Sequence, residues 1–224
     1  IDEQKILQNR GKLFVSNTRV EAINEAELKG YNVAILDDGL QDQSIMHDLS
    51  FVCFNTINWI GNGLTIPSGP LRENIKNIKN FKDVFFIGNL ENLETITEKI
   101  KKINPSVNIH IGEYIPRNIN EFSVNEKYII FSGIGNHDTF VSMVKKNRLN
   151  IIKDFEFPDH HNYTNNDINN ILEEAKNFNC KILTTEKDYL RLDETFKKFD
   201  EIKFIKSDLR ILDEKKLIDK LISI

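Results

Sequence analysis

Short apolar runs alternate with amphipathic segments along most of the chain. Runs rich in Val, Ile and Phe between turn-forming residues predict buried strands at 12–16, 32–36, 51–54, 83–87, 108–115, 128–132, 150–157, 181–184 and 202–206. Helical spacing between them predicts helices at 19–29, 91–102, 137–146, 165–177, 186–191 and 213–222. Strands that alternate with helices favour parallel sheets flanked by helices, which is the α/β class.

The alternation is interrupted between residues 107 and 127, where Pro116 and several Asn residues stand. We therefore expect residues 1–106 to form one domain, 107–127 an extended linker, and 128–224 a second α/β domain.

Composition narrows the class of protein. The chain has 224 residues, of which 40% are hydrophobic and 29% charged, which is typical of a folded domain. Its formal net charge is −4, so no basic excess indicates a nucleic-acid partner. Apolar runs such as 128–131 are far shorter than the ~20 residues that span a bilayer, so we expect no transmembrane helix.

The predicted strand at 32–36 ends directly in Asp37, Asp38 and Gly39. The carboxyl edge of a parallel sheet is where α/β proteins bind ligands, and a carboxylate there can serve the magnesium of a bound nucleotide. The alternative is an ordinary turn, because Asp-Asp-Gly is common turn chemistry.

Two further segments carry candidate chemistry. Arg72 follows a loop rich in Gly and Pro, where it could contact phosphate or pair on the surface with Glu73. His160 and His161 follow Asp159 after a strand, where one of them could act as a base or metal ligand. The alternative for the second segment is an Asx-type turn before a helix cap.

Residues 133–136 and 184–188 each join a predicted strand to a helix. Their backbone N–H groups could bind an anion, although a capped helix start explains them equally. The first segment lacks the third glycine of a dinucleotide-binding turn. The sequence contains no G-x-x-x-x-G-K-[ST] motif, so a P-loop phosphate cradle would have to lie outside these residues.

Taken in order, these segments resemble the tetraacyldisaccharide 4′-kinases, the lipid A 4′-kinase family. The motifs that carry the resemblance are D-D-G-L-Q at 37–41, G-N-G at 61–63, P-S-G-P-L-R-E at 67–73, S-G-I-G-N at 132–136, F-P-D-H-H-N-Y at 157–163 and T-T-E-K-D at 184–188. The D-D-G-[LF]-Q, G-P-L-R-E and F-x-D-H-x-x-Y segments are specific when they occur in one order.

The resemblance implies phosphate transfer from ATP to the 4′-hydroxyl of an acylated disaccharide-1-phosphate, at the cytoplasmic face of the inner membrane of Gram-negative bacteria. It implies a P-loop-NTPase-like parallel-sheet domain and a smaller Rossmann-like α/β domain, joined by a β-hairpin linker. The family's P-loop and membrane-anchoring stretch precede the matched motifs, so we expect the N-terminal part of the first domain to be missing and this chain alone to be inactive. Membrane contact would then depend on that missing segment.

The resemblance also implies roles for particular residues. By motif position these are Asp2 as catalytic carboxylate, His160 as its partner, Arg72 near the transferred phosphate, Asp37 and Asp38 at a Mg²⁺ site, and Gln41 with them in the ATP site. The family usually has His where Asp42 stands.

Two other interpretations remain open from the sequence. The chain could be a non-catalytic remnant or lipid-binding fragment of such a kinase. It could also be a metal-dependent phosphoesterase built on Asp37, Asp38, Asp159 and His160.

Overall fold

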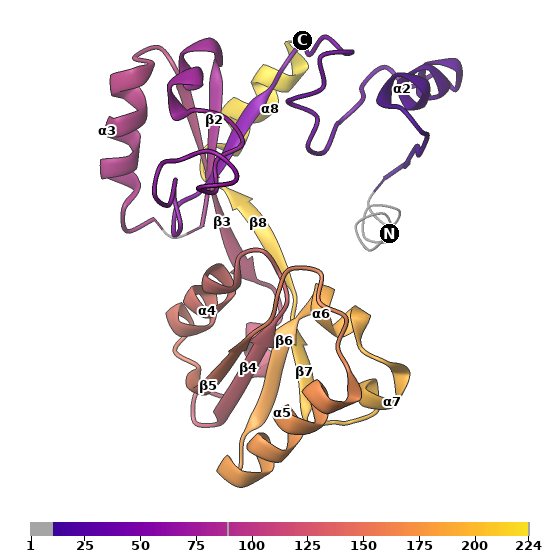
Figure 1. The fold of residues 1–224 in the computed structure, drawn as a ribbon, viewed down its shortest axis with the longest axis vertical. Helices are drawn as coiled ribbons and strands as arrows, with labels where there is room; N and C mark the ends of the chain where they lie inside the picture. The colour runs from indigo at the N-terminus through magenta and orange to yellow at the C-terminus, as the bar shows by residue number, and fades with distance from the viewer. Residues whose placement is uncertain (1–10, 89, 224) are drawn as a thin grey trace.

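The computed structural model describes residues 11–88 and 90–223, which form two four-stranded sheets drawn one above the other in Figure 1. The strands are β1 (Phe51–Asn55), β2 (Asp83–Ile87), β3 (Asn108–Pro116), β4 (Lys127–Ser132), β5 (Asn150–Glu156), β6 (Lys181–Thr185), β7 (Ile202–Ile205) and β8 (Ser207–Ile211). The α-helices are α2 (Arg19–Leu28), α3 (Leu93–Ile103), α4 (His137–Lys146), α5 (Asn165–Phe178), α6 (Glu186–Arg191), α7 (Glu194–Lys197) and α8 (Glu214–Ile222). Two 3₁₀ helices are η1 (Ile75–Asn80) and η2 (Ile119–Glu121). The predicted α/β class with parallel sheets is confirmed.

The second sheet has the order β5-β4-β6-β7, and its neighbouring strands are parallel. Alternate residues of its central strand β4 point to opposite faces. Tyr128 and Ile130 pack in a core with residues of α4, whereas Ile129 and Phe131 pack in a core with residues of α5 and α7. Both faces are therefore covered, which explains why this strand is a continuous apolar run.

Helix α5 shows how local sequence sets one of these layers. Thr164 and Asp167 form a reciprocal capping box at its start, and Asn179 ends it in the left-handed conformation. The buried residues recur at helical spacing: Ile168, Ile171, Leu172 and Ala175. One apolar stripe thus covers the sheet while the other side of the helix stays in water.

The first sheet has the order β1-β2-β3-β8, with β1, β2 and β3 parallel. Val84 and Phe86 of β2 lie in one core cluster with Ile96 and Ile100 of α3. Asp83 at the start of the same strand bonds to Lys220 of α8. Helices therefore contact this sheet through α3 and through the C-terminal α8 (Figure 1).

The two sheets do not follow the predicted division into a linker at 107–127 and a second domain at 128–224. β3 lies within the expected linker, yet it is a strand of the first sheet, and β8 pairs antiparallel with its second half. Residues 207–222 therefore return to the first sheet instead of completing the second. The two strands that run between the sheets in Figure 1 are far apart in the sequence, so their pairing is not a hairpin.

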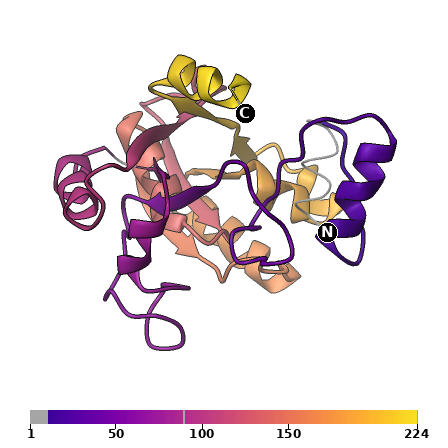
Figure 2. The same ribbon diagram turned by 90° about the horizontal axis from the view of Figure 1, so that it is seen from above.

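Two predicted strands, 12–16 and 32–36, are wrong: the structure has neither segment as a strand. A strand needs a neighbour for its backbone N–H and C=O groups, and the described part of the chain pairs none with them. Val33 and Ile35 are 79% and 94% exposed as a result. In Figures 1 and 2, α2, which separates these segments, lies to one side of both sheets.

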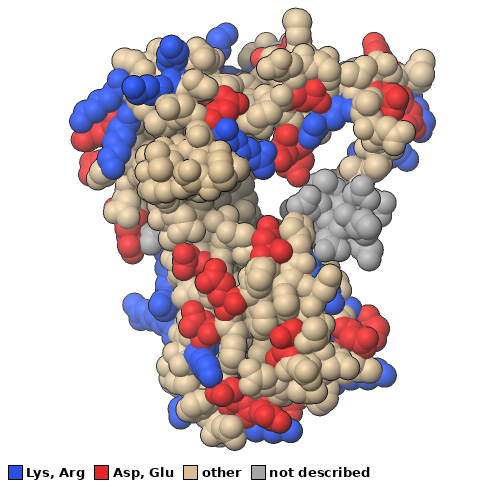
Figure 3. All heavy atoms as spheres, viewed as in Figure 1, with Lys and Arg blue, Asp and Glu red and all other residues tan. Residues whose placement is uncertain are grey.

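Helix length and surface charge both bear on function. Within the described ranges, no helix is long and apolar enough to cross a bilayer. On the face seen in Figure 3, acidic and basic side chains are interspersed over both halves of the molecule.

Candidate active site

The turn after the exposed segment 32–36 holds the predicted carboxylate pair. Asp38 has φ +55°, a left-handed conformation that Asp tolerates better than most residues. Arg19, the first residue of α2, donates from Nη2 to the backbone carbonyls of Asp37 (3.3 Å) and Asp38 (3.2 Å). One guanidinium therefore ties this turn to the start of the helix.

The side chain of Asp38 contacts the predicted arginine. Arg72 Nη1 donates to Asp38 Oδ1 at 2.6 Å and reaches Gln41 Oε1 at 3.5 Å. Gln41 Nε2 in turn lies 3.5 Å from Glu73 Oε1. The structure thus brings three predicted site residues together, with Arg72 and Asp38 side chains 56% and 60% exposed.

The loop that presents Arg72 is shaped by its own residues. Asn62 donates from Nδ2 to the carbonyl of Ser68 (2.7 Å) and accepts from the N–H of Leu64 (3.0 Å). A Cβ at Gly69 would collide with Asn62 Oδ1 and the backbone of Leu64, so this close approach requires glycine. The Gly- and Pro-rich sequence is explained by this tight folding of the loop.

Asp42, which follows the D-D-G-L-Q motif, supports the same turn. Its carboxylate accepts from the backbone N–H of Ser44 (3.0 Å) and from Arg19 Nη1 (3.3 Å). The hydrogen bonds from Ser44, with a smaller contribution from Arg19, lower the pKa of Asp42. An acidic residue here therefore holds the arginine that binds the Asp37–Asp38 turn.

Asp37 and Asp38 suit a divalent cation bound with phosphate. Both are exposed on one turn, and Mg²⁺ commonly takes one or two carboxylates together with substrate phosphates. The donor set of the turn fits a magnesium–phosphate group.

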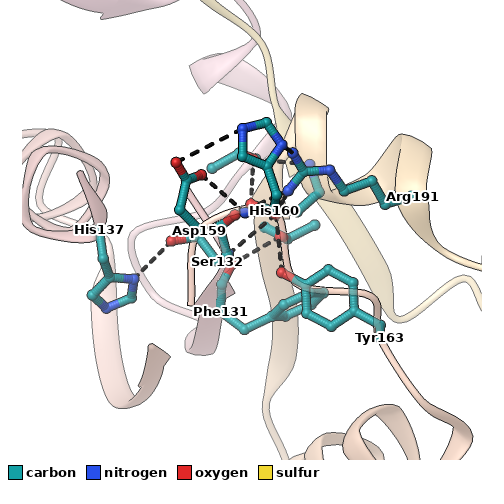
Figure 4. Close-up of polar contacts among 11 residues, drawn as sticks. Phe131, Ser132, His137, Asp159, His160, Tyr163 and Arg191 are labelled. Atoms are coloured by element: carbon teal, nitrogen blue, oxygen red, sulfur yellow. Dashed lines mark hydrogen bonds and ion pairs between the residues drawn. The ribbon is translucent and has the colours of Figure 1, made fainter. Parts of the chain in front are cut away.

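A second group of polar residues, which includes His160, Tyr163 and Arg191 (Figure 4), lies at the carboxyl edge of the second sheet. The fully buried Asp188 stands at its centre. The donors to its carboxylate are Gly133 N–H (3.1 Å), Tyr163 OH (3.0 Å), Thr185 Oγ1 (2.6 Å) and Arg191 Nη1 (3.3 Å). Burial of Tyr163, followed by the charge of Asp188, raises the pKa of its hydroxyl, so it stays a donor at neutral pH.

His160 borders this group and is tied to it. Its ring Nδ1 lies 2.9 Å from Arg191 Nη2, and its backbone N–H donates to the carbonyl of Gly133 at 3.1 Å. The residue has φ +59°, and its side chain is 51% exposed. His160 is thus held by its backbone and one ring nitrogen, while much of the ring faces solvent.

The neighbouring His161 has a different environment. Its Nε2 lies 3.0 Å from Asp167 Oδ2, and its ring stacks on Phe157 with centroids 4.8 Å apart. These contacts anchor the loop to the start of α5. The two adjacent histidines therefore have different partners: His161 pairs with Asp167, whereas His160 pairs with Arg191.

The polar side chains in the two strand-to-helix turns, at 184–188 and 132–137, form hydrogen bonds within the protein. Thr185 caps α6 by accepting from the N–H of Asp188, which agrees with a capped helix start. Ser132 Oγ lies 2.7 Å from His137 Nδ1, and His137 Nε2 lies 3.4 Å from Asp154 Oδ2. Ser132 is fully buried, so this Ser–His–Asp series braces the turn that follows β4 and offers no accessible nucleophile.

The hydrogen bonds thus assign the predicted residues to two groups. Asp38, Gln41 and Arg72 belong to the first and His160 to the second, whereas Asp2 lies outside the described residues. In residues 11–88 and 90–223, no three His, Cys, Asp or Glu side chains gather as a metal site. The four-residue set of the phosphoesterase interpretation is therefore not assembled within that part of the chain.

Sequence reasoning missed two arginines. Arg19 and Arg191 hold the two groups through contacts to Asp37, Asp38 and His160. The spacing of Asp188 and Arg191, three residues apart on a helix, was a signal that could have identified the second.

Comparison with known proteins gives a consistent family. The family model described as tetraacyldisaccharide-1-P 4′-kinase matches residues 2–224. A protein of Pelagibacter ubique (strain HTCC1062) named tetraacyldisaccharide 4′-kinase is 56% identical over 223 residues, which cover 100% of this chain and 70% of that protein. A protein of the same name from Rickettsia akari (strain Hartford) is 32% identical over 86% of this chain and 58% of its own length.

A solved structure also matches. The crystal structure of the "apo" form of LpxK from Aquifex aeolicus in complex with ATP gives a TM-score of 0.48 at 19% identity. The match covers 83% of this chain and 55% of that chain. The chain thus spans 70% of the Pelagibacter relative and little more than half of the other two proteins.

Proposed function

The chain belongs to the tetraacyldisaccharide-1-P 4′-kinase family, and we propose that it serves ATP-dependent phosphorylation of the 4′-hydroxyl of tetraacyldisaccharide-1-phosphate in lipid A biosynthesis. The observation that carries the proposal is the family match over residues 2–224. The contacts of Arg72 with Asp38 and Gln41 support it, because two motifs that are distant in sequence meet there.

The first group of residues suits the nucleotide side of this reaction. Phosphoryl transfer depends mainly on positioning and on neutralising charge. Asp37 and Asp38 would hold Mg²⁺, which when bound neutralises charge on the β- and γ-phosphates. Arg72 would exchange Asp38 for a phosphate oxygen, and Gln41 would line the same ATP site. We propose that the first sheet belongs to the P-loop-like domain.

The second group suits the acceptor side. His160 presents an accessible ring edge from the carboxyl end of a parallel sheet, where α/β proteins place ligands. We propose that Asp2 acts as the base toward the sugar hydroxyl and that His160 orients it. In this proposal the second sheet forms the Rossmann-like domain.

The substrate sets the location that we propose. An acylated disaccharide resides at a membrane surface, and ATP is available on the cytoplasmic side. We therefore propose peripheral association with the cytoplasmic face of the inner membrane.

The test is transfer of labelled phosphate from Mg-ATP to tetraacyldisaccharide-1-phosphate in mixed micelles. Three proteins are compared: this chain, this chain joined to the part of the Pelagibacter relative outside the match, and that whole relative as the positive control. We expect product from the joined protein. If the relative is active and the joined protein makes no product, the kinase proposal is wrong and a non-catalytic fragment takes its place.

A matched pair of variants tests the site. Asp38→Asn in the joined protein should lower the rate by about 100-fold or more, the size typical of a lost electrostatic contact in a transition state. Asp208→Asn is the control, because Asp208 is also an exposed carboxylate paired with an arginine. Equal rates for the two variants would remove Asp38 from the site.

A further inference from the structure

The ring of His160 is held by a side chain that can only donate. Arg191 Nη2 lies 2.9 Å from His160 Nδ1 (Figure 4). A guanidinium carries N–H donors and no acceptor, so Nδ1 must accept this hydrogen bond through its lone pair. A neutral ring in this contact therefore has its proton on Nε2.

The side chain of Arg191 is itself held by buried groups of the protein. Its side chain is 7% exposed, and Nη1 donates to the carbonyl of Gly133 (2.9 Å) and to Asp188 Oδ1 (3.3 Å). Asp188 is fully buried, so moving the arginine away would leave an uncompensated charge in the interior. The guanidinium is thus a rigid reference point for the His160 ring.

The backbone of His160 is fixed to the same point. Its N–H donates to the carbonyl of Gly133, which is also the acceptor for Arg191. The other ring nitrogen, Nε2, points away from Arg191 and lies 3.8 Å from Asp159 Oδ2, and the His160 side chain is 51% exposed. The Nε2–H group therefore faces the side from which a carboxylate or a substrate can approach.

We propose that Arg191 is a positioning residue that keeps His160 in the Nε2–H tautomer, so that His160 offers a hydrogen-bond donor to the reacting groups. This inference rests on the proposed function, in which the carboxylate oriented by that donor belongs to Asp2. His160 then acts as an orienting donor and does not itself remove the proton of the sugar hydroxyl.

The first test needs no kinase activity. Imidazole ¹⁵N spectra of the chain at a pH where His160 is neutral report the tautomer, and His160→Gln assigns the signals. We expect the Nε2–H pattern in the wild type, and a mixture of both tautomers in Arg191→Lys, which keeps a charge beside Asp188 but loses the second arm of the guanidinium. A wild-type Nδ1–H pattern, or an unchanged pattern in Arg191→Lys, would overturn the proposal.

Two further variants keep this test decisive. Arg117→Lys is the matched control, because Arg117 is a surface arginine paired with Asp208, and its spectrum should equal the wild type. If Arg191→Lys does not fold, Asp188→Asn combined with Arg191→Gln removes both buried charges together. The same loss of the single tautomer is expected there, and its retention overturns the proposal.

The second test uses the active joined protein. Arg191→Lys should lower kcat by about 10- to 100-fold with the KM for ATP unchanged, because a misplaced group costs rate. In a His160→Gln background the same substitution should have no further effect on kcat. Equal losses in both backgrounds would indicate a structural role and overturn the proposal. If no protein is active, the kinase proposal fails while the spectra still decide the role of Arg191.

Discussion

Two arginine–carboxylate pairs stand at the candidate site, and their surroundings differ. Arg72 and Asp38 are both more than half exposed, whereas Arg191 and Asp188 are 7% and 0% exposed. An exposed pair contributes little to stability, so a phosphate can replace one partner at small cost. A buried pair cannot open in this way, because the fully buried Asp188 would lose the guanidinium that balances its charge. The first pair is suited to exchange with a ligand and the second to holding other groups in place.

The contrast extends to the segments that carry the pairs. Arg191 is the last residue of α6, which follows β6 of the second sheet. The neighbouring strand β4 of that sheet is apolar and buried on both faces. Asp38 follows the segment 32–36, whose Ile35 is 94% exposed. The second group therefore has a packed support, while the first is held mainly by Arg19, Asp42 and the loop of Arg72.

The largest expected effect comes from breaking the buried pair. Asp188→Ala should lower the free energy of unfolding by about 3–5 kcal/mol, because it removes the buried carboxylate that accepts from Arg191 and from three further donors. Urea unfolding followed by circular dichroism measures the change. Asp38→Asn is the control, because Asn also tolerates the left-handed conformation of this residue, and its expected loss is about 0.2–1 kcal/mol. Similar losses for the two variants would contradict the comparison.

The second prediction compares the loss of stability on shortening an apolar side chain in the buried strand β4 and in the exposed segment 32–36. Ile130→Ala should cost about 2–5 kcal/mol, because a buried cavity forms in the core beneath α4. Ile35→Ala should change stability by less than about 0.5 kcal/mol, since its side chain already faces solvent. Thermal unfolding of the two variants in one buffer checks both values. A large loss for Ile35→Ala would show that the segment 32–36 is packed in solution.

The second sheet, from β4 to β7, could be predicted well because its signals are local. Strand β4 is a short apolar run between turns, and α5 carries its own cap and apolar stripe. Each element there finds its partners among its sequence neighbours. The alternation of strands and helices was therefore enough to predict a parallel sheet.

The wrong predictions concern pairings between distant segments. Residues 32–36 have the composition of a strand, yet composition does not supply the neighbour whose hydrogen bonds a strand needs. β8 was missed because it reads as a continuation of the residues before it, while its partner β3 lies far back in the chain. Propensity can indicate a strand, but the sheet that it joins depends on tertiary contacts.

The candidate site divides in the same manner. The motifs predicted Arg72, Asp38 and Gln41 as site residues, and in the structure these three residues form one hydrogen-bonded group. Motif position alone separated His160 from His161, and their environments now differ by hydrogen bonding and stacking. Arg191 lay outside every motif because its role depends on the fold around Asp188.

A third prediction concerns the charge buried in the first sheet. Asp83 is fully buried and bonds to Lys220 and His110. Burial raises its pKa, but the bonds to Lys220 and His110 outweigh burial, so the pKa of Asp83 is lowered from 3.8. Its contribution to stability is therefore complete above the unfolded pKa, and it is lost as the pH falls below about 4 through the folded pKa.

Asp83→Asn measures this contribution. It should cost about 1.5–3 kcal/mol at pH 7, because Lys220 loses a charged hydrogen-bond partner. The difference from the wild type should shrink as the pH falls from 5 toward 2, as followed by urea unfolding at each pH. Asp208→Asn, an exposed paired carboxylate, is the control. A difference that stays constant with pH would show that Asp83 is not the titrating group.

The smallest effect on stability is expected where we expect a large effect on activity. Arg72→Gln removes only an exposed contact, so the free energy of unfolding should fall by no more than about 1 kcal/mol. Phosphate transfer by the joined protein should fall by about 100-fold, because the guanidinium is proposed to neutralise charge on the moving phosphate. Arg117→Gln, which also breaks an exposed arginine–aspartate pair, should leave both quantities near their wild-type values. If Arg72→Gln instead destabilises the chain as strongly as Asp188→Ala, the pair at Asp38 is a support like the buried one, and the distinction between exchange and support does not hold.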